Sequence, residues 1–310
     1  MKKIIITGAG GLVGLSLLTK IDSLKYQITA IDKNKNNLRI AKKINPRIKT
    51  ICVDVSKNGS WEREFKGCDV VIQLQAQISS PLRIDYIKNN IESVKNIIKI
   101  CEKYKIKHLI HLSSSVVMSV ARDDYSETKT SGEKLVKDSK LKYTIFRPPL
   151  MYGEFDIKHL GFLANILDKS PVFPVPGSGK YIRQPLFVYD LVEIILNCLE
   201  APAKNQSFNI ISKEKIYFIE LIKEIARQRG QKRVFINIPL PIFSVLLKTY
   251  SLLFRKNPYE KSQLYALIAG DVFPVENWEK EFNVIYTPFK LGVCKMIKSK
   301  YYPLRKLMIK

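Results

Sequence analysis

The chain has 310 residues, of which 46% are hydrophobic and 26% are charged, so it can bury a large core and is not an intrinsically disordered protein. Its formal net charge is +24, from 52 Lys+Arg against 28 Asp+Glu, and such an excess admits nucleic acid, an anionic membrane or a phosphate-bearing substrate as partner. The lysines are spread along the whole chain and accompany no nucleic-acid-binding motif, which argues against nucleic acid. A genome rich in A and T, which favours lysine codons, explains the charge equally well.

The five cysteines and three histidines show none of the spacings typical of metal ligands, so we expect no metal site. Because the cysteines are odd in number and far apart, they are expected to be free thiols in a reducing cytoplasm. No window contains 18 uninterrupted apolar residues, and we therefore expect no transmembrane helix.

In the first half of the chain, short apolar strands alternate with helical patterns. Helices are predicted at Gly11–Leu24 and Asn90–Tyr104, among others. This alternation predicts a doubly wound α/β fold of the Rossmann type, whose parallel sheet is built by right-handed crossovers. The predicted strands are Lys3–Thr7, Gln27–Asp32, Ile48–Asp54, Asp69–Leu74, His108–Ser113 and Lys142–Arg147.

The pattern changes after Pro149, where predicted helices are separated by loops rich in Pro and Gly. We expect a dinucleotide-binding domain over residues 1–150 and a smaller substrate-binding lobe over 151–310, with segments around 183–211 returning to the sheet. The apolar stretch Pro239–Arg255 is interpreted as a helix that caps this lobe, and peripheral contact with a membrane is the less favoured alternative. The predicted helices are Gly161–Asp168, Val188–Leu199 and Phe218–Arg229.

The glycine-rich turn Thr7–Gly14 follows a strand and opens a helix, as in dinucleotide-binding sites. Its glycines permit a tight turn and a close approach of backbone amides to a pyrophosphate at the helix N-terminus. Asp32 closes the second strand 18 residues after Gly14 and can accept hydrogen bonds from a ribose 2′-hydroxyl. Since a carboxylate repels a 2′-phosphate, NAD is expected as cofactor in preference to NADP. Asp54 and Val55, after the third strand, are placed beside the adenine.

Tyr125 and Lys129 lie at positions i and i+4 of a predicted helix and therefore share one face. A cation one turn away is expected to stabilise the phenolate and to lower the pKa of the tyrosine towards neutrality. A hydroxyl from Ser113–Ser115, at the end of the preceding strand, could bind a substrate carbonyl or alcohol beside the tyrosine.

With these motifs the sequence resembles the extended short-chain dehydrogenases/reductases, typified by nucleotide-sugar epimerases and dehydratases. Further matching segments are Val71–Gln77, Asn90–Val94, Arg147–Gly153 and Arg183–Leu191. The resemblance implies Ser114, Tyr125 and Lys129 as the catalytic set, because Ser113–Ser119 matches the family's Ser-Ser-x-x-Val-Tyr-Gly. It implies substrate contacts from Gln77, Ser115 and Arg183, the last at a phosphate. It implies cofactor contacts from Gly8, Gly11, Leu12, Val13, Gly14, Asp32, Asp54, Val55, Leu74, Gln75, Ala76, Asn90, Lys129 and Pro148.

Several positions depart from the family pattern. Only ten residues separate Ser114 from Tyr125, about half the usual number, so one wall of the pocket is shortened. Met118 and Ser119 replace the usual tyrosine and glycine. Ser114 lacks the following Asp-Glu pair that sugar dehydratases need, which disfavours dehydration. Arg147-Pro148-Pro149 lacks the asparagine of hexose epimerases, which puts UDP-hexose in doubt as substrate.

We therefore expect an NAD-dependent nucleotide-sugar 4-epimerase or 4-keto reductase. The Pro171–Gly177 segment resembles epimerase-like proteins of polysaccharide gene clusters, which suggests a role in surface-polysaccharide biosynthesis. The alternative is a non-catalytic Rossmann protein that acts as a structural or assembly factor, because Gln184–Asp190 also resembles accessory subunits of respiratory complex I. Family resemblance further implies a homodimer formed through two helices of the dinucleotide-binding domain.

Overall fold

The computed structural model of the protein describes residues 1–120, 122–253, 268 and 270–308. The last two residues of the predicted Pro239–Arg255 stretch lie outside these ranges.

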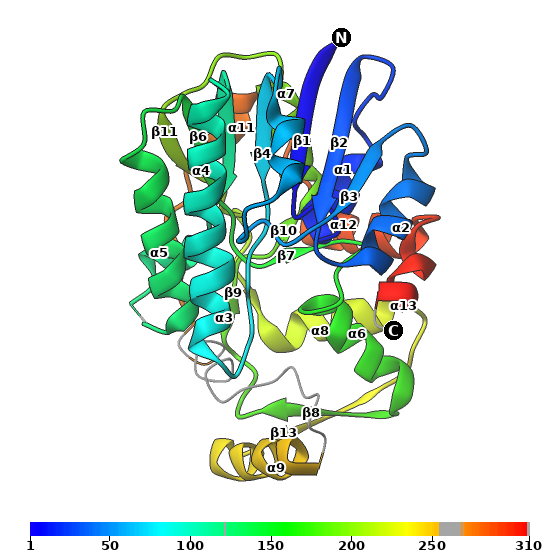
Figure 1. The fold of residues 1–310 in the computed structure, drawn as a ribbon. Helices are drawn as coiled ribbons and strands as arrows, with labels where there is room; N and C mark the ends of the chain where they lie inside the picture. Colours follow the sequence, from blue (N-terminus) through cyan, green and yellow to red (C-terminus); the bar gives the residue numbers. More distant parts are fainter. Residues whose placement is uncertain (121, 254–267, 269, 309–310) are drawn as a thin grey trace.

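Seven strands, all parallel, form one central sheet (Figure 1). Six of them fall where the sequence predicts strands, and the doubly wound α/β class is confirmed. The predicted strand Ile48–Asp54 is shortened to Lys49–Cys52 because it lies at the edge of the sheet and pairs with β2 alone. In spatial order the strands are β11 (Gln206–Asn209), β6 (Tyr143–Arg147), β5 (His108–Leu112), β4 (Val70–Gln73), β1 (Lys2–Thr7), β2 (Tyr26–Asp32) and β3 (Lys49–Cys52).

Both faces of the sheet are covered by helices, which explains its nearly continuous runs of isoleucine. Alternate residues of β1 point to opposite faces, so that Ile4 and Ile6 belong to one apolar cluster and Ile5 belongs to the other. All three side chains are fully buried. The first cluster includes helices α1 (Leu12–Leu18), α2 (Lys35–Ile44) and α7 (Val188–Cys198), and the second includes α4 (Ser93–Lys103) and α5 (Asp124–Lys137).

Two predicted helices have different bounds in the structure. The helix predicted at Gly11–Leu24 ends at Leu18, where Thr19 and Lys20 form a turn. The helix predicted at Asn90–Tyr104 has an earlier start, with α3 (Arg83–Ile87) and a wider π-helical turn (Lys88–Glu92) leading into α4. At this turn the Asn90 carbonyl oxygen approaches α5 so closely that a Cβ on Gly132 would collide with it.

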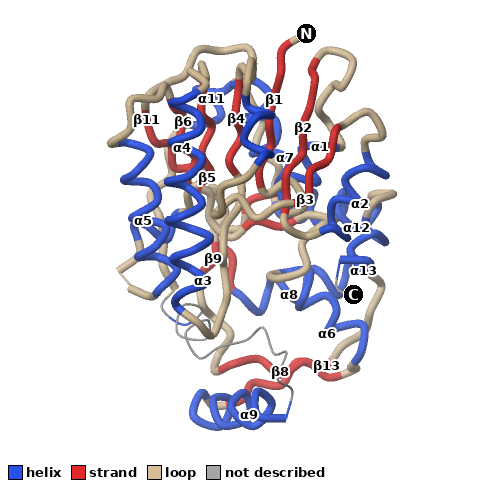
Figure 2. Tube along the Cα trace, viewed as in Figure 1, coloured by secondary structure: helices blue, strands red, loops and turns tan. Residues whose placement is uncertain are grey.

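The remaining elements form a lobe below the sheet with its own apolar cluster (Figures 1 and 2). Its two-stranded sheets pair β7 (Met151–Tyr152) with β10 (Leu186–Phe187), β9 (Ile182–Arg183) with β12 (Ile216–Tyr217), and β8 (Val172–Pro176) with β13 (Val234–Ile238). Its helices are α6 (Leu160–Lys169), α8 (Phe218–Gln228), α9 (Leu240–Leu253), α12 (Phe289–Lys298) and α13 (Arg305–Met308).

Within the predicted substrate lobe, α7 and β11 pack on or join the central sheet, and α11 (Trp278–Phe282) contacts α7. The domain division at residue 150 stays a prediction. Among the described residues, no helix combines the length and apolar character needed to cross a membrane.

Phe146 of β6 is fully buried and joins the C-terminal part of the chain to the sheet. Its ring meets Phe282 edge to face at 5.5 Å and Phe208 at 6.3 Å. We expect Phe146→Ala to lower the free energy of unfolding by about 3–5 kcal/mol, because it removes a large side chain from a closely packed cluster. Urea denaturation would measure the effect. The same measurement on Leu24→Ala, whose side chain is 67% exposed, should show a loss of no more than about 0.5 kcal/mol. Equal losses in the two variants would contradict the packing described here.

Candidate functional site

The predicted site residues follow the carboxyl ends of the parallel strands, which all meet at one edge of the sheet. The strand order places β4 and β2 on the two sides of β1, so that consecutive crossovers diverge there. In open α/β sheets a crevice for ligands forms at this kind of switch point. The loops at this edge carry Gly8 after β1, Asp32 at the end of β2, Asp54 after β3, Leu74 after β4, Ser114 after β5 and Pro148 after β6.

The glycine-rich turn forms a cradle that leaves no room for side chains. Gly8 has φ of +70°, and a Cβ there would lie 2.7 Å from the Cα of Gln75. A Cβ on Gly14 would lie 2.6 Å from the Cα of Ala9, where helix and turn pack closely. Gly11 differs, since its Cβ would meet only the Gly8 carbonyl oxygen at 3.4 Å. Helix α1 begins directly after the glycine-rich turn and has no side-chain cap. Leu12 and Val13 are its first two residues, and the backbone N–H groups at this end are available to a pyrophosphate.

Asp32 lies beside this cradle at the end of β2. Its carboxylate accepts hydrogen bonds from the backbone N–H of Gly10 at 2.9 Å and of Asn34 at 2.8 Å. Burial raises the pKa of Asp32, and the two backbone bonds oppose that rise. Gly10, which the sequence analysis did not select, is required here because a Cβ would lie 2.6 Å from the Cβ of Asn37, as well as 3.1 Å from a carboxylate oxygen of Asp32. The cradle and the carboxylate together fit a dinucleotide whose ribose carries a free 2′-hydroxyl.

The loop after β4 is held at both of its ends. Leu74 donates its N–H to the Thr7 carbonyl, and the Thr7 hydroxyl donates to Gln75 at 2.6 Å. Asn90 binds both backbone groups of Gln77, accepting at 2.7 Å and donating at 3.0 Å. Asn90 therefore orders the Leu74–Gln77 loop, which includes Ala76, and its amide also reaches Thr128 of α5 at 3.0 Å.

At the third strand, Asp54 already has a cationic partner. Lys88 forms an ion pair with its carboxylate at 3.0 Å, and Ser56 donates to it at 2.7 Å. These hydrogen bonds lower the pKa of Asp54 to about 2 against the opposing effect of burial. The neighbouring Val55 accepts from Asn96 through its carbonyl at 2.8 Å, so this loop is anchored to α4.

The structure brings the Ser114 hydroxyl close enough to Tyr125 to lower the pKa of the phenol, and Lys129 lies one turn after Tyr125 on α5. Lys129 is 3% exposed and donates its Nζ to the Leu112 carbonyl oxygen at 2.7 Å. Ser115 is also buried, and its N–H donates to the Pro148 carbonyl at 2.9 Å, which fixes the turn after β5.

The expected lowering of the tyrosine pKa is not what the structure shows. Burial raises the pKa of Tyr125 to about 12, and the nearby Ser114 hydroxyl only partly opposes this. Burial also lowers the pKa of Lys129 to about 8, against the attraction of Glu133. For each group desolvation is the largest influence. Tyr125 is therefore a protonated phenol at neutral pH.

Glu133, which the sequence analysis missed, is a buried carboxylate that attracts the Lys129 ammonium. Glu133 is 4% exposed, lies one turn after Lys129 on α5, and accepts from Ser113 at 2.7 Å. Arg147 forms a two-nitrogen ion pair with it, with Nε at 3.0 Å from Oε2, and Lys137 approaches at 2.7 Å. These hydrogen bonds outweigh burial and lower the pKa of Glu133 to about 2. Its i+4 spacing from Lys129 was the available signal in the sequence.

Arg183 lies on β9 at the substrate side of the site. Burial lowers the pKa of its guanidinium to about 10, and the Asp271 carboxylate opposes this, so the group is charged at neutral pH. Asp271 also accepts a hydrogen bond from Ser119. Gln184 binds both backbone groups of Phe273, accepting at 2.8 Å and donating at 3.2 Å, and so fixes the segment that carries Asp271. Gln184 lies in the family-matching segment Arg183–Leu191, whereas no local pattern in the sequence signalled Asp271.

Comparison with known proteins decides the family. The model of the NAD dependent epimerase/dehydratase family matches residues 4–211. The chain belongs to this family. It is 24% identical over 283 residues to UDP-glucose 4-epimerase of Vibrio cholerae, which is 83% of each chain. It is 23% identical over 263 residues to an Escherichia coli O157:H7 protein named N-acetyl-alpha-D-glucosaminyl-diphospho-ditrans,octacis-undecaprenol 4-epimerase, covering 77% of this chain and 76% of that protein.

The fold of the family is also found in solved structures. UDP-glucose 4-epimerase from Bifidobacterium longum, in complex with NAD+ and UDP, matches with a TM-score of 0.76 and 16% identity over 98% of each chain. At this identity the likeness concerns the fold alone. Family membership confirms the expectation of an NAD-dependent enzyme of the extended short-chain dehydrogenase/reductase type. The roles of its individual site residues stay predictions.

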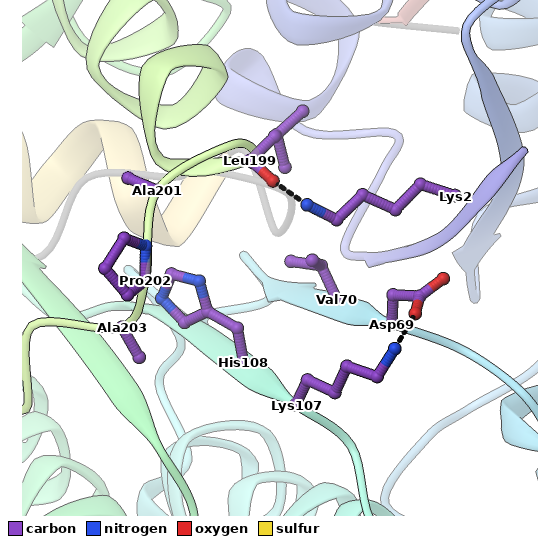
Figure 3. Close-up of a pocket in the computed structure, with 9 residues that line it drawn as sticks. All are labelled: Lys2, Asp69, Val70, Lys107, His108, Leu199, Ala201, Pro202 and Ala203. Atoms are coloured by element: carbon purple, nitrogen blue, oxygen red, sulfur yellow. Dashed lines mark hydrogen bonds and ion pairs between the residues drawn. The ribbon is translucent and has the colours of Figure 1, made fainter.

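A cavity at the opposite edge of the sheet is not part of this site (Figure 3). It lies where β1 and β5 begin, and its volume of about 120 Å³ is far below the roughly 300–1,000 Å³ of ligand pockets. Its charged groups are paired, Lys107 with Asp69 at 2.7 Å and Lys2 with the Leu199 carbonyl. Nowhere in the described ranges do three or more His, Cys, Asp or Glu side chains gather as a metal site would require.

Gly8 and Gly67 offer a matched test of the dinucleotide cradle. Both have a positive φ, +70° and +71°, but a Cβ on Gly67 would meet nothing within 4 Å. We expect Gly67→Ala to cost about 1 kcal/mol of stability through backbone strain, and Gly8→Ala to cost more because its Cβ also collides with the Gln75 backbone. We also expect Gly8→Ala, but not Gly67→Ala, to weaken NAD binding by tenfold or more. Thermal unfolding and calorimetric titration with NAD would separate the two effects. Equal NAD affinity in both variants would remove Gly8 from the site.

Glu133 should make stability depend on pH in the acid range. Its pKa falls from an ordinary 4.5 to about 2 in the folded protein, so its contribution is fully present above pH 4.5 and is lost as the pH falls towards 2. The shift corresponds to about 3 kcal/mol. Denaturant unfolding between pH 6 and 2.5 should show a steep loss in the wild type and a shallower one in Glu133→Gln. Parallel curves would contradict the contacts assigned to Glu133.

Proposed function

We propose that the protein is an NAD-dependent 4-epimerase of sugars linked through a diphosphate, with nucleotide sugars as the principal substrate class. The observation that carries the proposal is that Ser114, directly after β5, lies close enough to Tyr125 to lower its pKa. Tyr125 lies one helical turn before the buried ammonium of Lys129, at the sheet edge that also carries the Gly8–Gly14 turn. When bound, NAD supplies the hydride acceptor and donor.

In this proposal the protein's own groups manage the proton. Ser114 donates a hydrogen bond to the sugar oxygen and orients it towards Tyr125. Tyr125 would take the proton of the C4 hydroxyl as the hydride leaves and return it when the hydride comes back to the other face. This step needs the phenolate, which a pKa of about 12 makes scarce at neutral pH, so the catalytic complex has to stabilise that form. Lys129 stabilises that phenolate and contacts the nicotinamide ribose. The Arg183 guanidinium neutralises the substrate diphosphate.

Two features of the pocket support epimerisation without dehydration. Ser115 and Val116 occupy the positions after Ser114 and provide no acid–base pair for the elimination of water. In the described structure, Asp271 is bonded to Ser119 and faces Arg183, so it has partners other than the catalytic tyrosine.

A second candidate substrate is a sugar diphosphate carried on a polyprenol, as the name of the Escherichia coli relative indicates for that protein. The specific observation in its favour is the outward apolar stripe of α9, with Ile242, Val245 and Leu246 each more than half exposed. Such a lobe suits a substrate that is held at a membrane surface. A role in surface-polysaccharide biosynthesis accords with either candidate.

Substitution of Tyr125 tests the proposal. We expect Tyr125→Phe to lower kcat roughly 10²–10⁴-fold, because it removes the acid–base group, and to leave NAD content unchanged. A panel of UDP-, GDP- and dTDP-sugars, with the C4 epimers resolved by NMR, gives the measurement. Tyr104→Phe is the matched control, because Tyr104 ends α4 at the opposite edge of the sheet.

The cofactor balance separates the competing functions. An epimerase turns over without net consumption of NADH, whereas stoichiometric release of NAD+ with a keto-sugar would indicate a reductase and contradict the proposal. If Tyr125→Phe behaved like the wild type in every activity assay, the protein would instead be a non-catalytic Rossmann protein that acts as a structural or assembly factor.

A further inference from the structure

Helix α9 is apolar on both of its sides. Leu240, Phe243 and Leu247 are half-buried on the side towards the lobe, and Leu240 lies against Gly177. On the outward side Ile242, Val245 and Leu246 are 55%, 64% and 52% exposed. Their spacing of three and four residues makes them one stripe. On the surface helix of a globular protein this stripe is normally polar, and a helix that is apolar all round is normally covered on both sides.

The two-stranded sheet of β8 and β13, next to α9, also exposes apolar side chains. Val234 of β13 pairs with Val172 of β8, and these side chains are 59% and 37% exposed, as is Ile236 at 48%. Phe235, between the two exposed β13 residues, points the other way and packs on Phe173 in the lobe core at 6.0 Å. We call these residues the apolar end of the lobe: Val172, Val234, Ile236, Ile242, Val245 and Leu246.

The apolar end lies at the pole of the molecule opposite the amino ends of the strands (Figure 1). It is therefore on the same side of the sheet as the carboxyl ends of the strands and the candidate site. A partner that bound the apolar end would therefore contact the substrate lobe and not the helices that cover the two faces of the sheet.

The surrounding sequence is exclusively cationic. Residues 229–259 contain six basic residues and no acidic residue. Lys232 is exposed immediately before β13. The six basic residues are Arg229, Lys232, Arg233, Lys248, Arg255 and Lys256. Two of them have partners within the lobe, because Arg229 forms an ion pair with Asp168 and Arg233 donates to the Leu167 carbonyl at 2.8 Å.

We propose that the apolar end docks on the surface of an anionic lipid bilayer. Its exposed aliphatic side chains would enter the interfacial region, and the exposed Lys232 ammonium, two residues before Val234, would bind the headgroups, which is the recognition pattern of interfacial helices. A second copy of the chain fits this surface less well, because two identical cationic segments without acidic residues would repel each other across the contact. The proposal rests on the proposed function and selects its second substrate class, a sugar diphosphate anchored in the membrane by a polyprenyl chain.

Vesicle co-sedimentation of the full-length protein tests the docking. We expect binding to vesicles of phosphatidylcholine with 30% phosphatidylglycerol, weak binding to phosphatidylcholine alone, and loss of binding as salt is raised. The variant with Ile242→Gln, Val245→Gln and Leu246→Gln should bind at least tenfold more weakly. The control carries Leu24→Gln and Ile285→Gln, which alter side chains that are 67% and 86% exposed elsewhere, and should bind as the wild type does.

The substrate class is tested on the same vesicles. A hexosamine diphosphate on a polyprenyl chain, embedded in anionic vesicles, should be epimerised by the wild type and at least tenfold more slowly by the triple variant. Both proteins should act equally on a soluble nucleotide sugar and retain the same thermal midpoint. Tyr125→Phe should bind vesicles normally, so that failure of catalysis and failure of docking give different results.

Three results would overturn the inference. The wild type could fail to bind anionic vesicles, or the triple variant could bind them as well as the wild type does. Alternatively, sedimentation velocity could show that the triple substitution converts a dimer into a monomer while no vesicles are bound, which would assign the apolar end to a subunit interface.

Discussion

The buried ammonium group of Lys129 constrains the arrangement of everything around it. A cation that is 3% exposed must be compensated within the protein, and here the Leu112 carbonyl and the Glu133 carboxylate do this from β5 and from α5 itself. Glu133 in turn needs a cation, which Arg147 supplies from β6. Two adjacent strands and the catalytic helix are thereby joined by charge as well as by apolar packing. Ser113, bonded to Glu133, belongs to the same network and directly precedes the proposed catalytic serine.

Burial, and not this network, makes the tyrosine a weak acid. It raises the pKa of Tyr125 to about 12, while the Lys129 ammonium donates to a backbone carbonyl. The nearby Ser114 hydroxyl opposes the rise. Ser114 thus has two roles in the proposal, orienting the sugar oxygen and tuning the tyrosine.

The parts of the site that sequence could predict are those encoded by local patterns. Strands of consecutive isoleucines, the glycines after β1 and the acid that ends β2 each have a signature within a few residues, and parallel topology then brings them to one edge. The end of α1 at Leu18 was missed because apolar residues continue beyond it, as Ile21 is also buried. The pKa of Tyr125 was predicted in the wrong direction because desolvation depends on packing between segments far apart in sequence. Asp271 contacts Ser119 across 152 residues, a relation that no spacing reveals.

Asp271 brings to the candidate site a segment that follows α9 in the sequence. Gln184 anchors this segment beside the strand that carries Arg183. Ser119, in the short segment between Ser114 and Tyr125, binds Asp271. For a sugar held by a membrane-anchored diphosphate, the carrier chain must leave the pocket towards the bilayer, and the Arg183 guanidinium would meet the diphosphate on that path. In such an enzyme, selectivity for the carrier would come from the C-terminal part of the chain, whereas the hydride and proton chemistry would come from the sheet.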